Sequence, residues 1–184
     1  MSAEPKPRMS VDEFLAWAED RPGRYELDRG RAVAMAPEQA GHARMKFAVQ
    51  AALAAAIRRG SLPCEMFPDG MTVRIDRDTA YEPDALVRCG ALLDADAIEV
   101  SDPIVVVEVA SPSTKAIDNG VKLSGYFLVP SVRHHLLVDP GRRLVVHHRR
   151  GGDARIGTRI VTDGTLTLDP PGIRLALAEL FEGL

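Results

Sequence analysis

The chain has 184 residues, of which 46% are hydrophobic and 27% are charged. This composition is typical of one globular domain that can bury an apolar core, and it excludes fibrous and disordered proteins. The formal net charge of −3 argues against a large non-specific surface for nucleic acid, although a local basic patch could still contact phosphates.

The sequence carries no sign of a membrane segment or a signal peptide. No apolar run approaches the roughly 20 residues that a membrane-spanning helix requires. The start, MSAEPKPRMS, lacks the apolar region of a signal peptide. We therefore expect a cytoplasmic protein with no membrane contact, with residues 1–9 as a flexible N-terminal tail and residues 10–184 as a single domain.

The first part of the chain predicts two helices and a hairpin. Ser10, with Glu13 three residues later, forms the pattern of a capping box and predicts a helix over residues 11–20. The stretch RYELDRGRAVAMA, residues 24–36, predicts a hairpin. The Ala-rich residues 41–60, which end in glycine, give the strongest helix prediction in the chain.

The rest of the chain predicts mainly strands. The expected elements are strands over residues 71–77 and within 78–89, a loop or short helix over 90–102, a buried strand over 104–110, a helix around 118–129, hairpins over 135–148 and 157–169, and a strand or short helix at the C-terminal end. With no internal repeat and no linker, this order predicts one α/β domain with a strongly curved, mixed β-sheet flanked by α-helices.

The two cysteines, Cys64 and Cys89, lack the spacing of a metal site. We expect them to be buried free thiols rather than a disulfide or a nucleophile.

Glu108 is the most informative residue, because it interrupts the apolar run IVVVEVA. An ionised carboxylate in an apolar layer is costly unless it is paired, metal-bound or at an opening of the core. Alternation along a strand places Val106 and Glu108 on one face and Val105, Val107 and Val109 on the other. The carboxylate therefore emerges near the end of the strand, where a site is plausible.

Asp84 follows a proline at the start of another predicted strand. If the two strands are neighbours in the sheet, Asp84 and Glu108 meet at one edge. Two carboxylates and a backbone carbonyl are hard oxygen ligands of the kind that Mg²⁺ or Mn²⁺ accepts. The simpler alternatives are turn chemistry for Asp84 and a structural pair of Glu108 with an arginine or with Lys122.

These features resemble the PD-(D/E)XK nuclease superfamily: a proline followed by Asp84, Glu108 in an apolar strand, the SPST turn and a helix that bears a lysine. More closely, the chain is similar to a widespread bacterial family of restriction endonuclease-like proteins of unknown function. The motifs that carry this similarity are MSVDEFLAW, RYELDRGRAVAMAP, GHARMKFAVQAAL, YEPDALV, IVVVEVASPST, DNGVKLSGYFLVPSV, LLVDP and PPGIRLALAELF.

The resemblance implies a restriction endonuclease-like fold in which Asp84 and Glu108 hold a divalent metal, with the carbonyl of Val109 as a further ligand. The superfamily's usual lysine, two positions after the second acid, is absent, because Ala110 stands there. The family implies that Lys122, on the following helix, supplies the ammonium. The alternative is that Lys122 is a solvated helix residue.

Three further residues are site candidates. The resemblance implies that Glu26 is a catalytic acid that supports or joins the metal ligands, and that His42 lies near the mouth of the site. Tyr126 lies one helical turn after Lys122 and could hold it. Their simpler interpretations are a surface strand residue for Glu26 and a bystander for His42.

Two classes of function remain open. In the first, the protein is a metal-dependent DNA endonuclease: Mg²⁺ or Mn²⁺ polarises the phosphodiester and lowers the pKa of a bound water, and Lys122 orients that water or stabilises the developing charge. In the second, it is a catalytically weak or inactive nuclease-fold protein that acts as a DNA-binding or protein-interaction module. The displaced lysine and the acidic net charge favour the second, whereas retention of every carboxylate favours the first, since a module that needs only its shape has no use for a set of metal ligands. By analogy with enzymes that cut both strands, we expect a homodimer.

Two pairs of adjacent histidines, His134-His135 and His147-His148, lie in one predicted hairpin. Neighbours in a strand point to opposite faces, so neither pair can chelate zinc by itself, although one histidine from each strand could pair across the hairpin. The simpler expectation is that they are exposed. Four arginines bracket the same hairpin and could contact phosphates or form a solvated face: Arg142, Arg143, Arg149 and Arg150.

Overall fold

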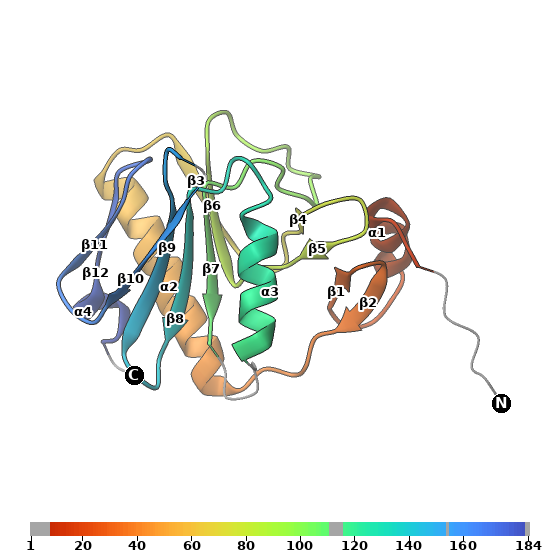
Figure 1. The fold of residues 1–184 in the computed structure, drawn as a ribbon, viewed down its shortest axis with the longest axis horizontal. Helices are drawn as coiled ribbons and strands as arrows, with labels where there is room; N and C mark the ends of the chain where they lie inside the picture. Colours follow the sequence, from red (N-terminus) through yellow and green to blue (C-terminus); the bar gives the residue numbers. More distant parts are fainter. Residues whose placement is uncertain (1–7, 111–115, 154, 183–184) are drawn as a thin grey trace.

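The computed structural model describes residues 8–110, 116–153 and 155–182. Its centre is a six-stranded sheet in the order β10-β9-β8-β7-β6-β3 (Figure 1). Strands β7 and β8 run parallel, and the other neighbours in this sheet are antiparallel. The strands are β3 (Cys64–Pro68), β6 (Ala85–Cys89), β7 (Val105–Val109), β8 (His134–Asp139), β9 (Leu144–Arg150) and β10 (Ile156–Val161).

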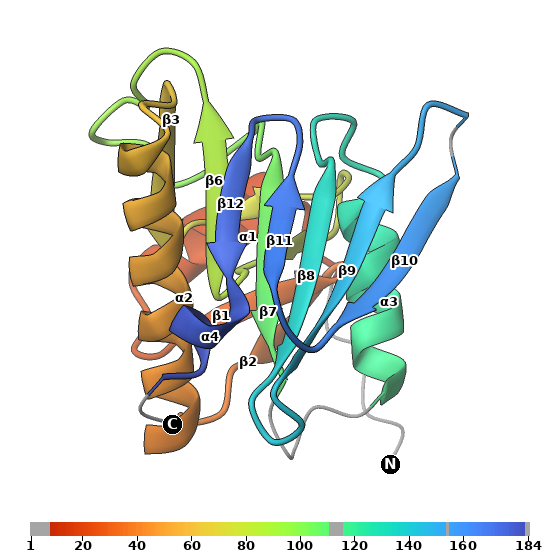
Figure 2. The same cartoon turned by 90° about the vertical axis from the view of Figure 1, so that its left-hand side faces the viewer.

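Helices cover both faces of this sheet (Figures 1 and 2). Helix α2 (Ala40–Arg59) packs on one face together with the hairpin of β11 (Thr165–Leu168) and β12 (Ile173–Ala176) and the short helix α4 (Leu177–Leu180). Helix α3 (Ala116–Tyr126) packs on the other face. A mixed sheet flanked by helices confirms the predicted α/β class.

The run IVVVEVA forms β7, and its side chains alternate as predicted. Val105, Val107 and Val109 join the core beneath α2, whereas Val106 joins the core beneath α3. Glu108 therefore lies on the α3 side of the sheet.

A second, smaller sheet lies beside α3, with the order β2-β1-β5-β4. Its strands are β1 (Tyr25–Asp28), β2 (Arg31–Ala34), β4 (Val73–Arg74) and β5 (Ala80–Tyr81), and helix α1 (Val11–Glu19) packs against β1. The capping box of α1 is present, because the backbone N–H of Ser10 donates to Oε2 of Glu13 at 2.7 Å and the N–H of Glu13 donates to Oγ of Ser10 at 3.3 Å. The β1–β2 turn uses Arg29 and Gly30, whose φ angles of 47° and 77° fit a tight hairpin turn.

Some predicted elements differ in the structure. Residues 157–169 do not form a hairpin, because β10 pairs with β9 and β11 pairs with β12. Leu166 and Leu168 of β11 are buried under the face that α2 covers, whereas β10 is exposed, so the two strands belong to different layers. The strand expected over 71–77 is reduced to β4, and 78–89 is divided into β5 and β6. The SPST turn and nearly all of the predicted tail lie outside the described residues.

The prediction for the cysteines was wrong. Cys64 on β3 and Cys89 on β6 are direct partners in the antiparallel register, and their sulfurs form a disulfide. They are 25 residues apart in the sequence, with β4 and β5 of the other sheet between them, so their proximity follows from strand pairing and not from local spacing.

The histidines of the β8–β9 hairpin are also placed differently from the simpler expectation. His134, His135 and His147 are buried rather than exposed, and Nδ1 of His134 lies 2.9 Å from Nε2 of His147 across the hairpin. Nε2 of His134 lies 2.8 Å from the carbonyl oxygen of Pro170. The histidine pair therefore ties the hairpin to the turn between β11 and β12, and at least one of the two rings is neutral, because one of the two facing ring nitrogens must accept.

Three of the four arginines near this hairpin are bound to backbone carbonyls. Arg150 donates to the carbonyl oxygens of Phe127, Val129 and Val132 at 2.7 to 3.0 Å. Other such bonds run from Arg143 to Phe181 and from Arg149 to Asp169. These contacts hold loops in place, so the expected phosphate-binding patch has little support. None of the described helices is both long and apolar enough to cross a membrane.

The buried histidines predict an acid-sensitive fold. Burial lowers the pKa of His147 to about 4 and also lowers that of His134, whereas an unfolded histidine titrates near about 6.5. Between these two pKa values the unfolded chain binds a proton that the folded chain does not. The contribution of the neutral histidines to stability is therefore complete above about pH 6.5 and declines as the pH falls toward about 4. The unfolding free energy of the wild type should fall between pH 7.5 and pH 5, and urea denaturation measures this fall. In His147→Asn we expect the fall to be smaller by about 1 kcal/mol. Equal differences in wild type and variant would contradict this.

Candidate active site

Asp84 is fixed at the point where β6 begins and β7 ends. The two strands are antiparallel, with Ala85 opposite Val107. The backbone N–H of Val109 donates to Oδ2 of Asp84 at 2.7 Å, and Gln50 of α2 donates to the backbone carbonyl of Asp84 at 2.9 Å. The Asp84 side chain is therefore buried against the end of β7, which argues against a simple role in a turn.

Among the residues that the structure describes, Glu108 has two polar partners, and both come from α3. The hydroxyl of Tyr126 donates to Oε1 of Glu108 at 2.7 Å. The ammonium of Lys122 lies 3.4 Å from the same oxygen. Lys122 and Tyr126 are one helical turn apart, so both side chains reach the same strand. Glu108 is thus the paired buried carboxylate that the sequence predicts.

Glu26 of β1 brings the small sheet into the same cluster. The ammonium of Lys122 lies closer to Oε1 of Glu26, at 2.7 Å, than to Glu108. The same oxygen of Glu26 accepts from the backbone N–H of Glu82 at 3.0 Å. Lys122 also lies 5.6 Å from the centre of the Tyr81 ring. These contacts argue against a solvated Lys122 and against a simple surface position for Glu26.

His42, near the start of α2, lies on the Asp84 side of the cluster. Its Nε2 is 3.0 Å from the carbonyl oxygen of Val109, and its Nδ1 is 2.8 Å from Oε1 of Glu38. Nε2 of His42 also lies 3.8 Å from Oδ2 of Asp84. The imidazole therefore contacts the carbonyl that the family resemblance implies as a metal ligand.

Lys46 is a buried site residue that the sequence interpretation missed. Its ammonium lies 2.5 Å from Glu38, 2.7 Å from Asp69 and 3.8 Å from Asp84. Only 6% of its side chain is exposed. The signal was present, because Lys46 follows His42 by one helical turn and both therefore face the same way.

A further ion-pair chain supports Lys46 from the outside. Asp69 also pairs with Arg24, and Arg24 pairs with Glu82 at 2.6 Å. The backbone N–H of Glu82 donates to Glu26, which closes the chain back to Lys122. The Asp84 side and the Glu108 side of the site thus belong to one polar network.

The two central carboxyl groups hold protons more tightly than free ones do. Burial, with the nearby charges of Asp84 and Glu26, raises the pKa of Glu108 to about 7, although the charge of Lys122 opposes this shift. Burial also raises the pKa of Asp84, against the hydrogen bond from Val109. A divalent cation would displace these protons, because its charge stabilises the ionised carboxylates.

The two buried lysines remain charged. Burial disfavours the charged form of Lys122, but Glu108 and Glu26 outweigh it and raise its pKa. In the same way, burial disfavours the charge of Lys46, but hydrogen bonds to Asp69 and Glu38 raise its pKa. Each lysine is therefore a fixed positive charge on one side of the carboxylates, rather than a general base.

The donor set suits a hard divalent cation. Asp84 and Glu108 could supply carboxylate oxygens, and the Val109 carbonyl oxygen contacts the same nitrogen of His42 that lies 3.8 Å from Asp84. A second group consists of Glu38, His42 and Asp84, each with a potential ligand atom within 4.8 Å of those of the other two. In that group Glu38 is already bound to Lys46, so the ammonium competes with a metal there. Asp84 belongs to both sets.

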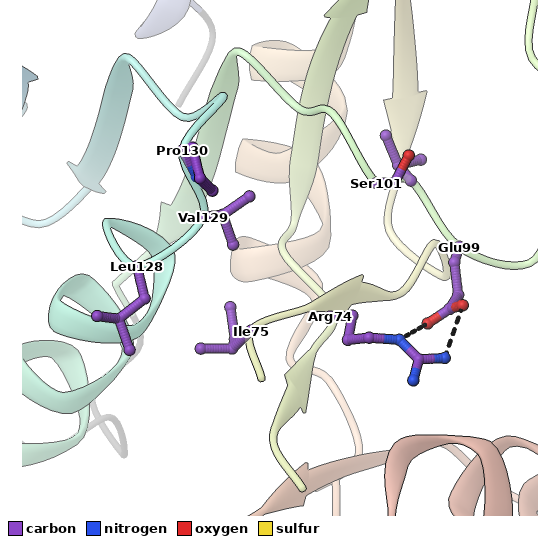
Figure 3. A pocket seen from close by; sticks show the side chains of 8 residues that line it. Arg74, Ile75, Glu99, Ser101, Leu128, Val129 and Pro130 are labelled. Carbon is purple, nitrogen blue, oxygen red and sulfur yellow. Dashed lines mark hydrogen bonds and ion pairs between the residues drawn. The ribbon is translucent and has the colours of Figure 1, made fainter. Parts of the chain in front are cut away.

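A cavity of about 240 Å³ lies elsewhere, between β4, the chain around Glu99 and the end of α3 (Figure 3). Its lining includes Arg74, whose guanidinium is bound to Glu99 at 3.0 Å and to Asp12 at 2.6 Å. None of the candidate site residues lines it. The cavity is therefore separate from the carboxylate cluster.

The fold and the paired carboxylates at the β6–β7 junction define a restriction endonuclease-like protein of the PD-(D/E)XK superfamily. The family model described as "Putative restriction endonuclease" (Uma2) matches residues 11–178, and the chain belongs to this family.

The chain is also similar to other proteins over most of its length. The uncharacterized protein slr1290 of Synechocystis sp. is 25% identical over 182 residues, which cover 98% of this chain and 95% of that protein. The uncharacterized protein sll1609 of the same organism is 26% identical over 148 residues, covering 79% and 82% of the two chains. A crystal structure described as a putative nuclease belonging to DUF820, from Anabaena variabilis, matches with a TM-score of 0.73 at 16% identity, covering 94% of this chain and 97% of that one. That structural likeness concerns the fold.

Removing one member of the Lys122–Glu108 pair is expected to destabilise the protein. Lys122→Met leaves two buried carboxylates without their cation, and we expect a loss of about 3 kcal/mol in unfolding free energy at pH 8. Adding Glu108→Gln to this variant should restore part of the loss, because one uncompensated charge is removed. Urea denaturation measures both, with the exposed Arg142→Met as the control that changes little. If Lys122→Met is as stable as the control, the pair is not structural.

Proposed function

We propose that this protein is a metal-dependent DNA endonuclease that hydrolyses phosphodiester bonds. The observation that carries the proposal is that Asp84 accepts from the backbone N–H of Val109, the residue after Glu108, and its charge acts on Glu108, while Lys122 lies beside Glu108. The family described as restriction endonuclease agrees with it. The proposed metal ligands are Asp84, Glu108 and the Val109 carbonyl, and Mg²⁺ or Mn²⁺ would supply Lewis acidity and a bound water of lowered pKa.

The residues of this chain have distinct proposed roles. Lys122, held charged by Glu26 and Glu108, stabilises the negative charge that develops on the phosphoryl oxygens as water attacks phosphorus and the P–O bond to the leaving strand breaks. Tyr126 orients Glu108 through its hydroxyl, and Glu26 positions Lys122.

On the other side of the site, His42 orients the Val109 carbonyl. Lys46 provides a second positive charge near Asp84 and the phosphate. This side completes the charged surroundings in which the phosphodiester would be bound.

We propose that the enzyme is a cytoplasmic homodimer that acts on DNA, since cleavage of both strands requires two sites. The second candidate function is a nuclease-fold module that binds DNA or a protein without cutting. One observation favours it: Lys122 lies nearer to Glu26 than to Glu108, so its charge is largely compensated.

Metal binding can be tested without any nucleic acid. We expect Mn²⁺ and Mg²⁺ to bind to the wild-type protein in calorimetric titrations, and Asp84→Asn to weaken binding about 100-fold or abolish it, because Asp84 belongs to every available ligand set. Asp163→Asn, at an exposed position in the β10–β11 turn, is the matched control and should bind as wild type does. Equal binding by both variants would exclude a metal site at Asp84.

Cleavage tests the enzyme directly. We expect the wild type to cut supercoiled, branched or single-stranded DNA with Mn²⁺ or Mg²⁺, and Glu108→Ala and Lys122→Ala to lose about 100-fold or more of the rate. The exposed Glu179→Ala should keep it.

Variants must be confirmed as folded by circular dichroism, because Glu108 and Lys122 also stabilise the core. A wild type that binds metal yet leaves all three substrates intact would contradict the enzyme and favour the binding module.

A further inference from the structure

Strand β10 is an open edge of the six-stranded sheet. It pairs with β9 on one side, and no other described strand pairs with it (Figure 2). Five of its six residues are exposed, among them Ile156 and Ile160 with exposed fractions of 42% and 68%. An edge strand of this kind presents unpaired N–H and C=O groups that can accept another strand.

The sequence of β10 does little to protect this edge. Proteins block edge strands with lysine, proline, bulges or a covering element. The sequence IGTRIV contains neither lysine nor proline, and Arg159 is its single charge. The opposite edge, β3, ends in Pro68 and packs against α2. The two edges therefore differ in protection, and β10 is the edge that is open to pairing with another strand.

We propose that β10 is the interface of a homodimer, in which β10 of a second copy of this chain adds antiparallel to it and joins the two sheets. The proposal identifies the surface through which the dimer proposed above would form. It rests on the proposed homodimer and not on the proposed cleavage of DNA.

The strand is complementary to itself in one register. Ile156, Thr158 and Ile160 lie on one face, because side chains alternate along a strand. With the two-fold axis at Thr158, Ile156 of each copy lies opposite the partner's Ile160, and Thr158 lies opposite its own counterpart. The dimer thus gains two apolar cross-strand pairs and one threonine pair, each of a favourable type.

Charge selects this register over its neighbours. With the axis at Thr158, Arg159 lies opposite the small Gly157. Moving the axis to Gly157 would place Arg159 opposite Arg155, and moving it to Arg159 would place this arginine opposite its own counterpart. Directly opposed like charges destabilise a strand pair. This self-complementarity indicates a second copy rather than an unrelated peptide.

The proposed interface lies away from the carboxylate cluster. The site is built on β6, β7, α3 and the start of α2, whereas β8 and β9 separate β7 from β10. Pairing along β10 therefore leaves the site accessible, so assembly and metal binding can be measured independently of each other.

A cysteine placed on the two-fold axis tests the register. Opposed Cα atoms in an antiparallel pair are about 4.5–5.5 Å apart, within the range of a disulfide. The two native cysteines already form a disulfide with each other. We expect Thr158→Cys to form a covalent dimer on oxidation. Arg159→Cys, the matched control on the same strand, should not, because its counterpart is about 8 Å away. Cross-linking of Arg159→Cys but not Thr158→Cys would overturn this register.

Sedimentation equilibrium of unmodified protein tests the interface itself. We expect a wild-type dimer, a shift to monomer for Ile160→Asp, and an unchanged dimer for Val33→Asp, which places the same charge at an exposed position on the edge strand β2 of the other sheet. A wild-type monomer at about 100 μM, or a dimer that Ile160→Asp leaves intact, would overturn the proposal. A Mn²⁺ titration of the Ile160→Asp variant separates the two proposals. If this variant is monomeric but binds Mn²⁺ as the wild type does, the substitution has disrupted the interface and not the active site.

Discussion

The burial of Glu108 beneath α3 is the constraint on which the site depends. A carboxylate within an apolar strand needs a cation, and Lys122 provides it from a helix rather than from the strand itself. Because Lys122 also binds Glu26, one ammonium connects the large sheet, the small sheet and α3. Helix α3 must lie close for this contact, and Gly125 permits it: a Cβ there would lie 2.8 Å from the Tyr81 ring. Any larger residue at position 125 would push the helix, and with it the ammonium, away from the carboxylates.

The balance of charge in the network favours a bound cation. Among the described residues, the network holds six carboxyl groups, Glu26, Glu38, Asp69, Glu82, Asp84 and Glu108, against three cations, Arg24, Lys46 and Lys122. Asp69 and Glu38 have a lowered pKa, because hydrogen bonds and charges from their partners overcome the effect of burial. The pKa values of Asp84 and Glu108 are raised instead, mainly by burial, so these two carboxylates are the ones whose ionised form the protein itself stabilises least. That is where a divalent cation would lower the free energy most.

The sequence predicted the local elements and the Lys122–Glu108 pair, but not the partners that come from long-range packing. Tyr126, which was expected to hold Lys122, donates to Glu108 instead. The apolar run around Glu108 and the proline before Asp84 indicated two adjacent strands, and the structure pairs them. Lys46 was missed because its partner Asp69, which follows β3, meets it only when α2 packs against β3. Strand periodicity likewise identified β10 and β11 but could not assign their partners, since alternation specifies faces and not neighbours. The disulfide between Cys64 and Cys89 was not predicted either, because the pairing of β3 with β6 cannot be read from the sequence pattern.

The carboxylate of Asp84 is stronger evidence for a chemical role of the site than the ammonium of Lys122 is. Lys122 is needed to bury Glu108 whether or not the protein cuts DNA, so its presence fits either function. Asp84, in contrast, accepts a backbone N–H and, among the described residues, has no side-chain cation closer than 3.8 Å. An asparagine could accept the same bond without the cost of burying a charge. Packing therefore explains a polar residue at position 84 but not a carboxylate, and the carboxylate is the feature that a metal site requires.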